Sequence, residues 1–285
     1  MDKLLFPRTD VAGISIPRMI GGTNWIAGWS HRSPAQDQMI RDAHSTTKSV
    51  TPIIEAFARN GVDAMMCPFQ SSPVLVDAIR ETEQKLGQKI IMIDTPIINV
   101  ENSTEGRKEA EATIAKSQEI GATFCLIHHV SAEQLVRKDK HQIERIDDYT
   151  KLIRDHGMIP GLSAHMPELV VYSDENEYDI ETYIQIYNCM GFLMQVEVES
   201  VHRIIHQAKK PVMTIKSMAA GRVTPFVGLN FNWATIRDCD MVTVGCFTPQ
   251  EVEEDIEISR AFFEHRPPRV GKRASPSHNQ SAFGK

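Results

Sequence analysis

The sequence lacks the features that mark several large classes of protein. No stretch reaches the ~18 consecutive apolar residues of a membrane-spanning helix, and the first residues show no hydrophobic stretch of a signal peptide. The five cysteines are odd in number, widely spaced and form no Cys-x-x-Cys pair. That pattern disfavours a disulfide framework and fits reduced thiols. We therefore expect a cytoplasmic protein that has no membrane partner.

An excess of positive charge is also missing, because 31 basic residues stand against 37 acidic ones and give a net charge of −6. Broad nucleic-acid binding needs a positive face that displaces counterions, so the expected partner is a small-molecule substrate and not a nucleic acid. The sequence contains no G-x-x-x-x-G-K-[ST] phosphate loop, no H-E-x-x-H zinc helix and no G-x-S-x-G nucleophile elbow. The sequence therefore lacks the commonest signatures of enzymes that hydrolyse nucleotides, of zinc proteases and of serine hydrolases.

What is present is an alternation of short apolar runs with longer amphipathic stretches, repeated about eight times. Strands that are apolar on both faces are typical of a buried parallel sheet, and alternation with helices implies crossover connections. Eight such units in this length predict an α/β protein with the (β/α)₈ TIM-barrel fold. The runs cover residues 14–20, 63–69, 89–98, 123–129, 158–165, 182–187, 212–217 and 241–247.

The pattern predicts one domain over residues 1–265 and a basic, flexible tail over residues 266–285. Residues 26–48 are interpreted as a long first loop, and loops of this length are often functional. Glycines such as Gly87 and Gly121 stand where a left-handed residue would end a helix. Helices are predicted over residues 50–60, 73–86, 105–120, 132–156 and 249–264.

Polar residues at the ends of the apolar runs are the candidate catalytic groups, because TIM-barrel enzymes carry their reactive groups at the carboxyl ends of strands. Asp94, His128 and His165 end three consecutive runs. Such a set suits acid–base catalysis or a divalent metal. Neighbouring strand residues face opposite ways, so His128 is expected to point inward and His129 to pack outward or into the rim. The alternatives are an aspartate that caps a turn and a structural histidine.

Lys216 ends the seventh run, where an ammonium group could bind an anion or form a Schiff base. A lysine whose stem merely covers apolar surface is the alternative. Arg222 is a nearby candidate anion clamp. Trp25 could form an aromatic wall for a sugar-like substrate or a hydrophobic lid. The predicted catalytic set is thus Asp94, His128, His165 and Lys216, and the predicted substrate-binding set is Asn24, Trp25, Gln185, Asn188 and Arg222.

Several segments, taken in their order along the chain, resemble the aldo-keto reductase family. Residues 6–23 are similar to its N-terminal hairpin and first strand, and residues 125–129 to the fourth-strand segment with the catalytic histidine. The resemblance implies a TIM barrel whose bottom is closed by a β-hairpin, and it implies a nicotinamide cofactor. Similar segments for the fifth to eighth strands are residues 161–163, 184–188, 216–222 and 244–254.

The sequence departs from this family where the family does its chemistry. Its reductases use a tyrosine as proton donor, with an aspartate and a lysine nearby. Residues 65–70, where the tyrosine should follow, contain neither tyrosine nor aspartate, and Asp94 stands in place of the lysine. Of the family's four catalytic residues only His128 is matched, and residues 247–250 lack the basic groups expected near a nicotinamide phosphate. The resemblance therefore implies the barrel with its hydride-transfer apparatus replaced.

Three hypotheses follow. The first is an isomerase, lyase or hydrolase that acts by acid–base or metal-assisted chemistry on a small polar, carbohydrate-like substrate. Its divalent metal would be bound by Asp94, His128 and His165. The second is an NAD(P)H-dependent oxidoreductase with a rearranged proton donor, Tyr187 or His128; NADP is the less favoured cofactor. The third is a non-catalytic binding protein, and a homo-oligomer is compatible with all three.

Overall fold

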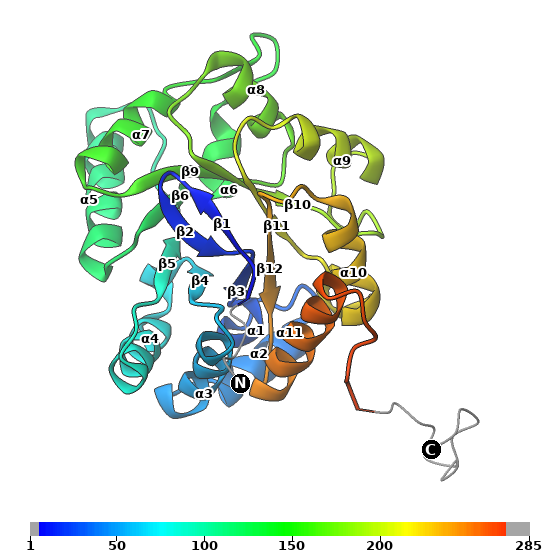
Figure 1. The fold of residues 1–285 in the computed structure, drawn as a ribbon. Coiled ribbons are helices and arrows are strands. Elements are labelled where there is room, and N and C mark those ends of the chain that lie inside the picture. Colours follow the sequence, from blue (N-terminus) through cyan, green and yellow to red (C-terminus); the bar gives the residue numbers. More distant parts are fainter. Residues whose placement is uncertain (1–5, 272–285) are drawn as a thin grey trace.

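Eight parallel strands close into a barrel in the computed structural model, which describes residues 6–271 (Figure 1). The predicted (β/α)₈ fold is confirmed. Around the barrel each strand pairs with its neighbour, and β12 pairs with β3 to close the ring. The strands are β3 (Met19–Gly22), β4 (Ala64–Cys67), β5 (Ile91–Asp94), β6 (Phe124–Ile127), β9 (Ile159–Ala164), β10 (Thr182–Ile186), β11 (Val212–Ile215) and β12 (Met241–Gly245).

An antiparallel hairpin precedes the barrel, as predicted. It consists of β1 (Arg8–Val11) and β2 (Ile14–Pro17). The two residues between them, Ala12 and Gly13, have φ of 54° and 82°, the positive values that a tight hairpin turn requires. Val11 and Ile16 belong to the same buried cluster as the side chains inside the barrel. The hairpin therefore closes the end of the barrel at which the strands begin.

Helices surround the barrel (Figure 1). Gly87 and Gly121 adopt the left-handed conformation at φ 65° and 95° and follow the last residues of α4 and α5, as predicted. No helix among residues 6–271 is both long enough and apolar enough to cross a membrane. The main helices are α3 (Thr47–Arg59), α4 (Pro73–Leu86), α5 (Thr104–Ile120), α7 (Ile146–Asp155), α8 (Glu168–Asn176), α9 (Val198–Gln207), α10 (Pro225–Thr235) and α11 (Pro249–Phe263).

The long helix predicted over residues 132–156 is wrong. This stretch contains the end of α6 (His129–Ala132), the 3₁₀ helix η2 (Glu133–Leu135), a small hairpin of β7 (Val136–Arg137) and β8 (Gln142–Ile143), and then α7. Residues 137–141 are all charged or histidine, so no apolar face continues through them.

The first loop is also more ordered than predicted. It contains α1 (Asn24–Ala27) and α2 (Pro34–Ala43). Ser33 caps α2 by accepting a hydrogen bond from the Gln36 backbone N–H, and Pro34 occupies the first helical position. This Ser-Pro pair is a helix-start signal that the interpretation as a loop had overlooked.

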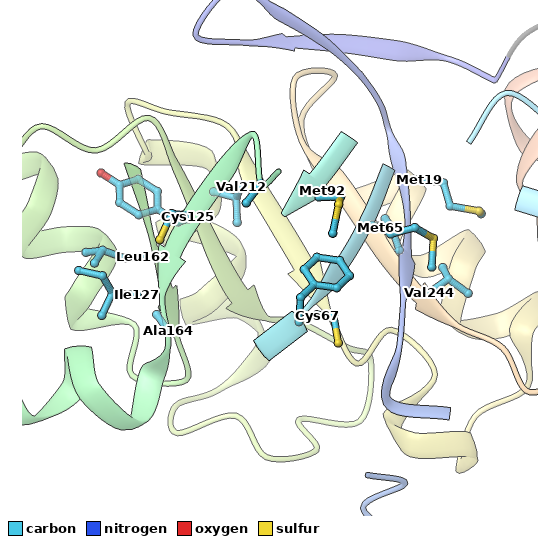
Figure 2. Packing of buried hydrophobic residues seen from close by; sticks show 14 of the residues in the cluster. Met19, Met65, Cys67, Met92, Cys125, Ile127, Leu162, Ala164, Val212 and Val244 are labelled. Atoms are coloured by element: carbon cyan, nitrogen blue, oxygen red, sulfur yellow. The ribbon is translucent and has the colours of Figure 1, made fainter. Parts of the chain in front are cut away.

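Alternation along the strands divides the core into two layers. Side chains such as Met66, Phe124 and Leu126 fill the inside of the barrel. Their neighbours Met65 and Cys125 lie in the outer layer, between strands and helices (Figure 2). Every second residue of a strand faces the barrel interior and the residues between them face the helices. This position in the alternation is called the phase of a residue, and it governs where the polar strand-end residues point.

The chain after α11 is described only to residue 271. Arg266 pairs with Glu257, with Nη1 and Oε1 2.6 Å apart. Most of the tail predicted over residues 266–285 lies outside the described residues, and the domain boundary at residue 265 stays a prediction.

Candidate active site

A cavity of about 960 Å³ opens where the barrel strands end, the end at which TIM barrels carry their active sites. Its wall is formed by the ends of barrel strands and by the first loop, together with the segment after β11. The side chains that could carry charge or transfer protons there include His31, His128, His129, His165, Lys216 and Arg222.

His128 and His129 follow β6. His128 continues the interior phase of Phe124 and Leu126, and its Nδ1 accepts a hydrogen bond from the Val130 backbone N–H at 3.3 Å. Both histidines line the cavity, so the outward position, one of the two expected for His129, is not the one that it takes. The strand ends at Ile127 and α6 begins at His129, so the alternation of a strand no longer applies there.

His165 follows β9 and continues the phase of Ser163, which also lines the cavity. Its ring stacks on that of His129, with centroids 3.6 Å apart and planes inclined by 21°. The backbone N–H groups of His165 and Met166 both donate to Glu133 Oε1 at 2.8 Å. Glu133 therefore ties the end of β9 to the segment after β6 and holds the stacked rings together.

Lys216 follows β11 with a backbone φ of 64°, a left-handed conformation that is uncommon for residues other than glycine and often marks a functional site. The phase of the strand alone would direct its side chain outward, but the turn brings Lys216 to the cavity wall. Its Nζ lies 2.9 Å from His31 Nε2. Asn24 Nδ2 lies 3.4 Å from the same nitrogen of His31.

Burial is the main reason that these groups resist protonation. Burial, together with the nearby His129 and Lys216, lowers the pKa of His128 to about 4 and that of His165 to about 3. Burial also lowers the pKa of His31, and it lowers the pKa of Lys216 to about 8. At neutral pH the cavity therefore presents neutral imidazoles beside a lysine that gives up its proton close to physiological pH.

Three of the predicted substrate-binding residues also reach the cavity. Asn24 and Trp25 begin α1 and line it. Arg222 lies on the segment after β11, where its guanidinium stacks over the Phe192 ring at 4.1 Å and donates to the Ala219 carbonyl. The structure thus brings Asn24, Trp25 and Arg222 together with His128, His165 and Lys216.

The other three predicted residues, Asp94, Gln185 and Asn188, do not line the cavity. Asp94 shares the outward phase of Met92, its Oδ1 accepts from the Phe69 backbone N–H at 2.9 Å, and burial raises its pKa. The outward phase likewise buries Gln185 away from the cavity. Asn188 Oδ1 accepts from two backbone N–H groups of its own loop. The structure therefore does not assemble Asp94, His128 and His165 into one set.

Sequence reasoning missed His31, His129 and Glu133 as site residues. His31 lies in the predicted functional loop but was not singled out. Glu133 stands four residues after His129, the separation at which two side chains meet on one helix face. That spacing was the available signal for the pair.

The start of α11 lies where TIM barrels often bind phosphate, at a helix N-terminus that follows one of their last two strands. Here Glu251 Oε2 accepts from the backbone N–H groups of Phe247 and Thr248. The protein's own carboxylate thus occupies the amide donors, and Glu254 and Asp255 add acidic groups to the adjoining wall. This end of the cavity does not fit the phosphates of a nicotinamide cofactor.

The closed barrel with its hairpin is a TIM-barrel fold that is similar to solved structures described as aldo-keto reductases. Two solved structures from Pseudomonas aeruginosa, provisionally described as aldo-keto reductases, match with a TM-score of 0.65 at 11% and 12% identity. Both matches cover 91% of this chain and 95% of the other. Aldose reductase from Giardia lamblia matches with a TM-score of 0.52 at 11% identity, over 90% of this chain and 88% of the other.

No protein-family profile and no curated protein matches the sequence. At identities this low the structural likeness shows the fold alone. The chemistry must therefore be argued from the side chains of the cavity.

Proposed function

We propose that this protein is an enzyme that binds a small, polar, anionic substrate in the cavity and acts on it by acid–base chemistry. The observation that carries the proposal is the contact between Lys216 Nζ and His31 Nε2 at 2.9 Å on the cavity wall. Among the described residues no carboxylate forms an ion pair with Lys216. A buried ammonium group without a counter-ion is costly, and an anionic substrate would supply the missing partner.

Different residues of the cavity would bind the substrate and transfer protons. Lys216 and Arg222 would hold an anionic or carbonyl oxygen and stabilise the negative charge that develops on it. Neutral His128 accepts the Val130 N–H at Nδ1, so its ring proton is on Nε2 and can be donated to a substrate oxygen as the neighbouring carbon loses its proton to solvent. Proton abstraction next to a stabilised oxygen is the chemistry of isomerases and lyases, and Trp25 offers an apolar face for a sugar-like substrate.

Hydride transfer is the less supported alternative. A reductase of this fold needs a nicotinamide cofactor, whereas Glu251 fills the amide donors at the start of α11. The acid–base proposal needs only groups that line the cavity.

Calorimetric titration with glucose 6-phosphate, gluconate and uncharged glucose tests the proposal. We expect saturable binding of at least one of the two anions, much weaker binding of glucose, and loss of anion binding in Lys216→Met. Lys151→Met is the matched control, because Lys151 pairs with Asp155 on the exposed face of α7. Equal anion affinity in Lys216→Met would overturn the proposal. So would saturable binding of NADPH with no binding of either anion.

Deuterium exchange tests the chemistry separately. In D₂O the wild-type protein should exchange a carbon-bound proton of a ligand that it binds, and His128→Asn should slow this exchange while the ligand still binds. Exchange at the same rate in both proteins would remove His128 from the proton-transfer step.

A further inference from the structure

Two imidazoles and a carboxylate meet at the rim of the cavity between β6 and β9. His129, Glu133 and His165 each offer one ligand atom, and these atoms all lie within 4.8 Å of one another. His129 and His165 also line the cavity. The group is therefore open to a ligand in the cavity.

The carboxylate of Glu133 is held in place on one side only. Its Oε1 accepts the backbone N–H groups of His165 and Met166, both at 2.8 Å. Its Oε2 faces His129 Nδ1 at 4.0 Å. One oxygen thus anchors the side chain, while the other is left for a ligand next to the two rings.

We infer that His129, Glu133 and His165 bind a divalent transition-metal ion, with zinc as the chemical type. Two nitrogen donors and one oxygen donor suit Zn²⁺ and its neighbours, whereas Mg²⁺ and Ca²⁺ prefer oxygen ligands alone. Three protein ligands leave a coordination position for substrate or water, as catalytic zinc sites do. Of the metal ligands predicted from the sequence only His165 belongs to this set.

Binding requires a small local rearrangement. Ligand nitrogens lie ~2.0–2.1 Å from zinc, and stacked rings do not direct their lone pairs at one point. The rings of His129 and His165 must therefore turn out of their 21° stack. The His129 side chain is 24% exposed and lies in the first turn of the four-residue helix α6, so its ring has room to turn.

A bound metal ion would take part in the proposed acid–base chemistry, and this catalytic role of the ion rests on the proposed function. A metal that shares the cavity with Lys216 would polarise a substrate oxygen or a bound water, so that a proton is more easily removed. The metal-binding claim itself is tested without any substrate.

Cobalt titration followed by visible absorption is the test, because Co²⁺ replaces Zn²⁺ and reports its own coordination geometry. Metal-free wild-type protein should bind one equivalent of Co²⁺, and Zn²⁺ should displace it. His165→Asn and Glu133→Gln should each lower the affinity at least ~10–100-fold, the loss expected even for an outer-shell partner. Glu133→Gln keeps an oxygen that can accept the backbone N–H groups of His165 and Met166.

The double variant His202→Asn/His206→Asn is the matched control. These histidines lie four residues apart on α9 with ring centroids 4.3 Å apart, yet neither lines the cavity. Co²⁺ binding should survive in this control. Unchanged binding in Glu133→Gln and His165→Asn, or loss of binding in the control, would overturn the metal site.

The two proposals fail in different ways. Anion binding by metal-free wild-type protein, without stoichiometric Co²⁺ binding, would overturn the metal site and leave the Lys216 site standing. Stoichiometric Co²⁺ binding without anion binding, in both metal-free and metal-loaded protein, would overturn the proposed function and support the metal site.

Discussion

Asp94 and His165 are both polar residues at the end of a buried barrel strand, yet the structure places them in different layers. Asp94 ends β5 in phase with Met92 and faces the helices, where the Phe69 backbone N–H binds its carboxylate. His165 follows β9 in phase with Ser163 and reaches the cavity. Position at a strand end is thus not enough to make a site residue, because the phase along the strand decides which layer receives the side chain.

The largest expected effect concerns Asp94, the residue of this pair that faces the helices. Asp94→Ala should lower the free energy of unfolding by about 2–4 kcal/mol, because it leaves the buried Phe69 N–H without a partner and opens a small void. Gluconate affinity of the folded protein should stay within twofold of wild type. Urea unfolding and calorimetry measure the two quantities. A large loss of affinity in a fully folded Asp94→Ala variant would show that Asp94 contributes to ligand binding after all.

Asp94→Asn is the conservative companion, and the pH dependence of stability distinguishes it from wild type. Burial raises the folded-state pKa of Asp94 above its ordinary value of 3.8, so the folded state binds this proton more tightly than the unfolded state. The carboxyl therefore contributes stability at low pH that is lost as pH rises from about 3.8 through the folded-state pKa. The variant should lack this loss when both unfolding curves are measured across that range.

How far the sequence predicts the molecule follows from the same phase argument. Apolar runs and helix-ending glycines such as Gly121 report local conformation, and the barrel could be predicted from them. The hairpin was implied by the resemblance of residues 6–23 to the aldo-keto reductase family. The directions of the Asp94 and Gln185 side chains could also have been predicted, by counting alternate residues back to their apolar neighbours. His129 and Lys216 could not be placed in this way, because a helix start and a left-handed residue interrupt the alternation there.

Loss of Lys216 should produce the next largest effect. Lys216→Met removes a charge-assisted hydrogen bond, which is worth ~1.5–3 kcal/mol or roughly 10–150-fold in affinity for an anion. Stability should change little, since the variant no longer buries an amine. Isothermal titration with gluconate measures the affinity, and Lys151→Met should match wild type. An affinity loss in Lys151→Met as large as that in Lys216→Met would assign the effect to net charge and not to the cavity.

The pH dependence of anion binding sharpens the role of Lys216. Its pKa of about 8 means that the cationic form, which attracts the anion, is lost as pH rises through that value. Gluconate keeps a constant charge there, so its affinity should fall by up to ~10-fold per pH unit above 8. The groups that face Lys216 have lowered pKa values and stay neutral in this range; they are His31, His128, His129 and His165. A flat affinity profile between pH 7 and 10 would contradict this role.

The smallest expected effect concerns Gln185, a second outward-facing residue. Its Oε1 is buried and has no hydrogen-bond partner among residues 6–271, so the polar group contributes little to stability. Gln185→Met, which preserves volume, should change the free energy of unfolding by less than ~1.5 kcal/mol. Gluconate affinity should not change. A specific loss of affinity in this variant would mean that phase does not separate structural from site residues.

The most direct test of the account is whether the histidines of separate strands meet in one cavity. Nuclear Overhauser measurements on protein labelled in its histidine rings should show contacts from His129 to both His128 and His165, whose ring centroids lie 4.3 Å and 3.6 Å away. The pair His202 and His206, at 4.3 Å, is the internal reference. Cross-peaks in the reference pair without any between His129 and His165 would contradict the account.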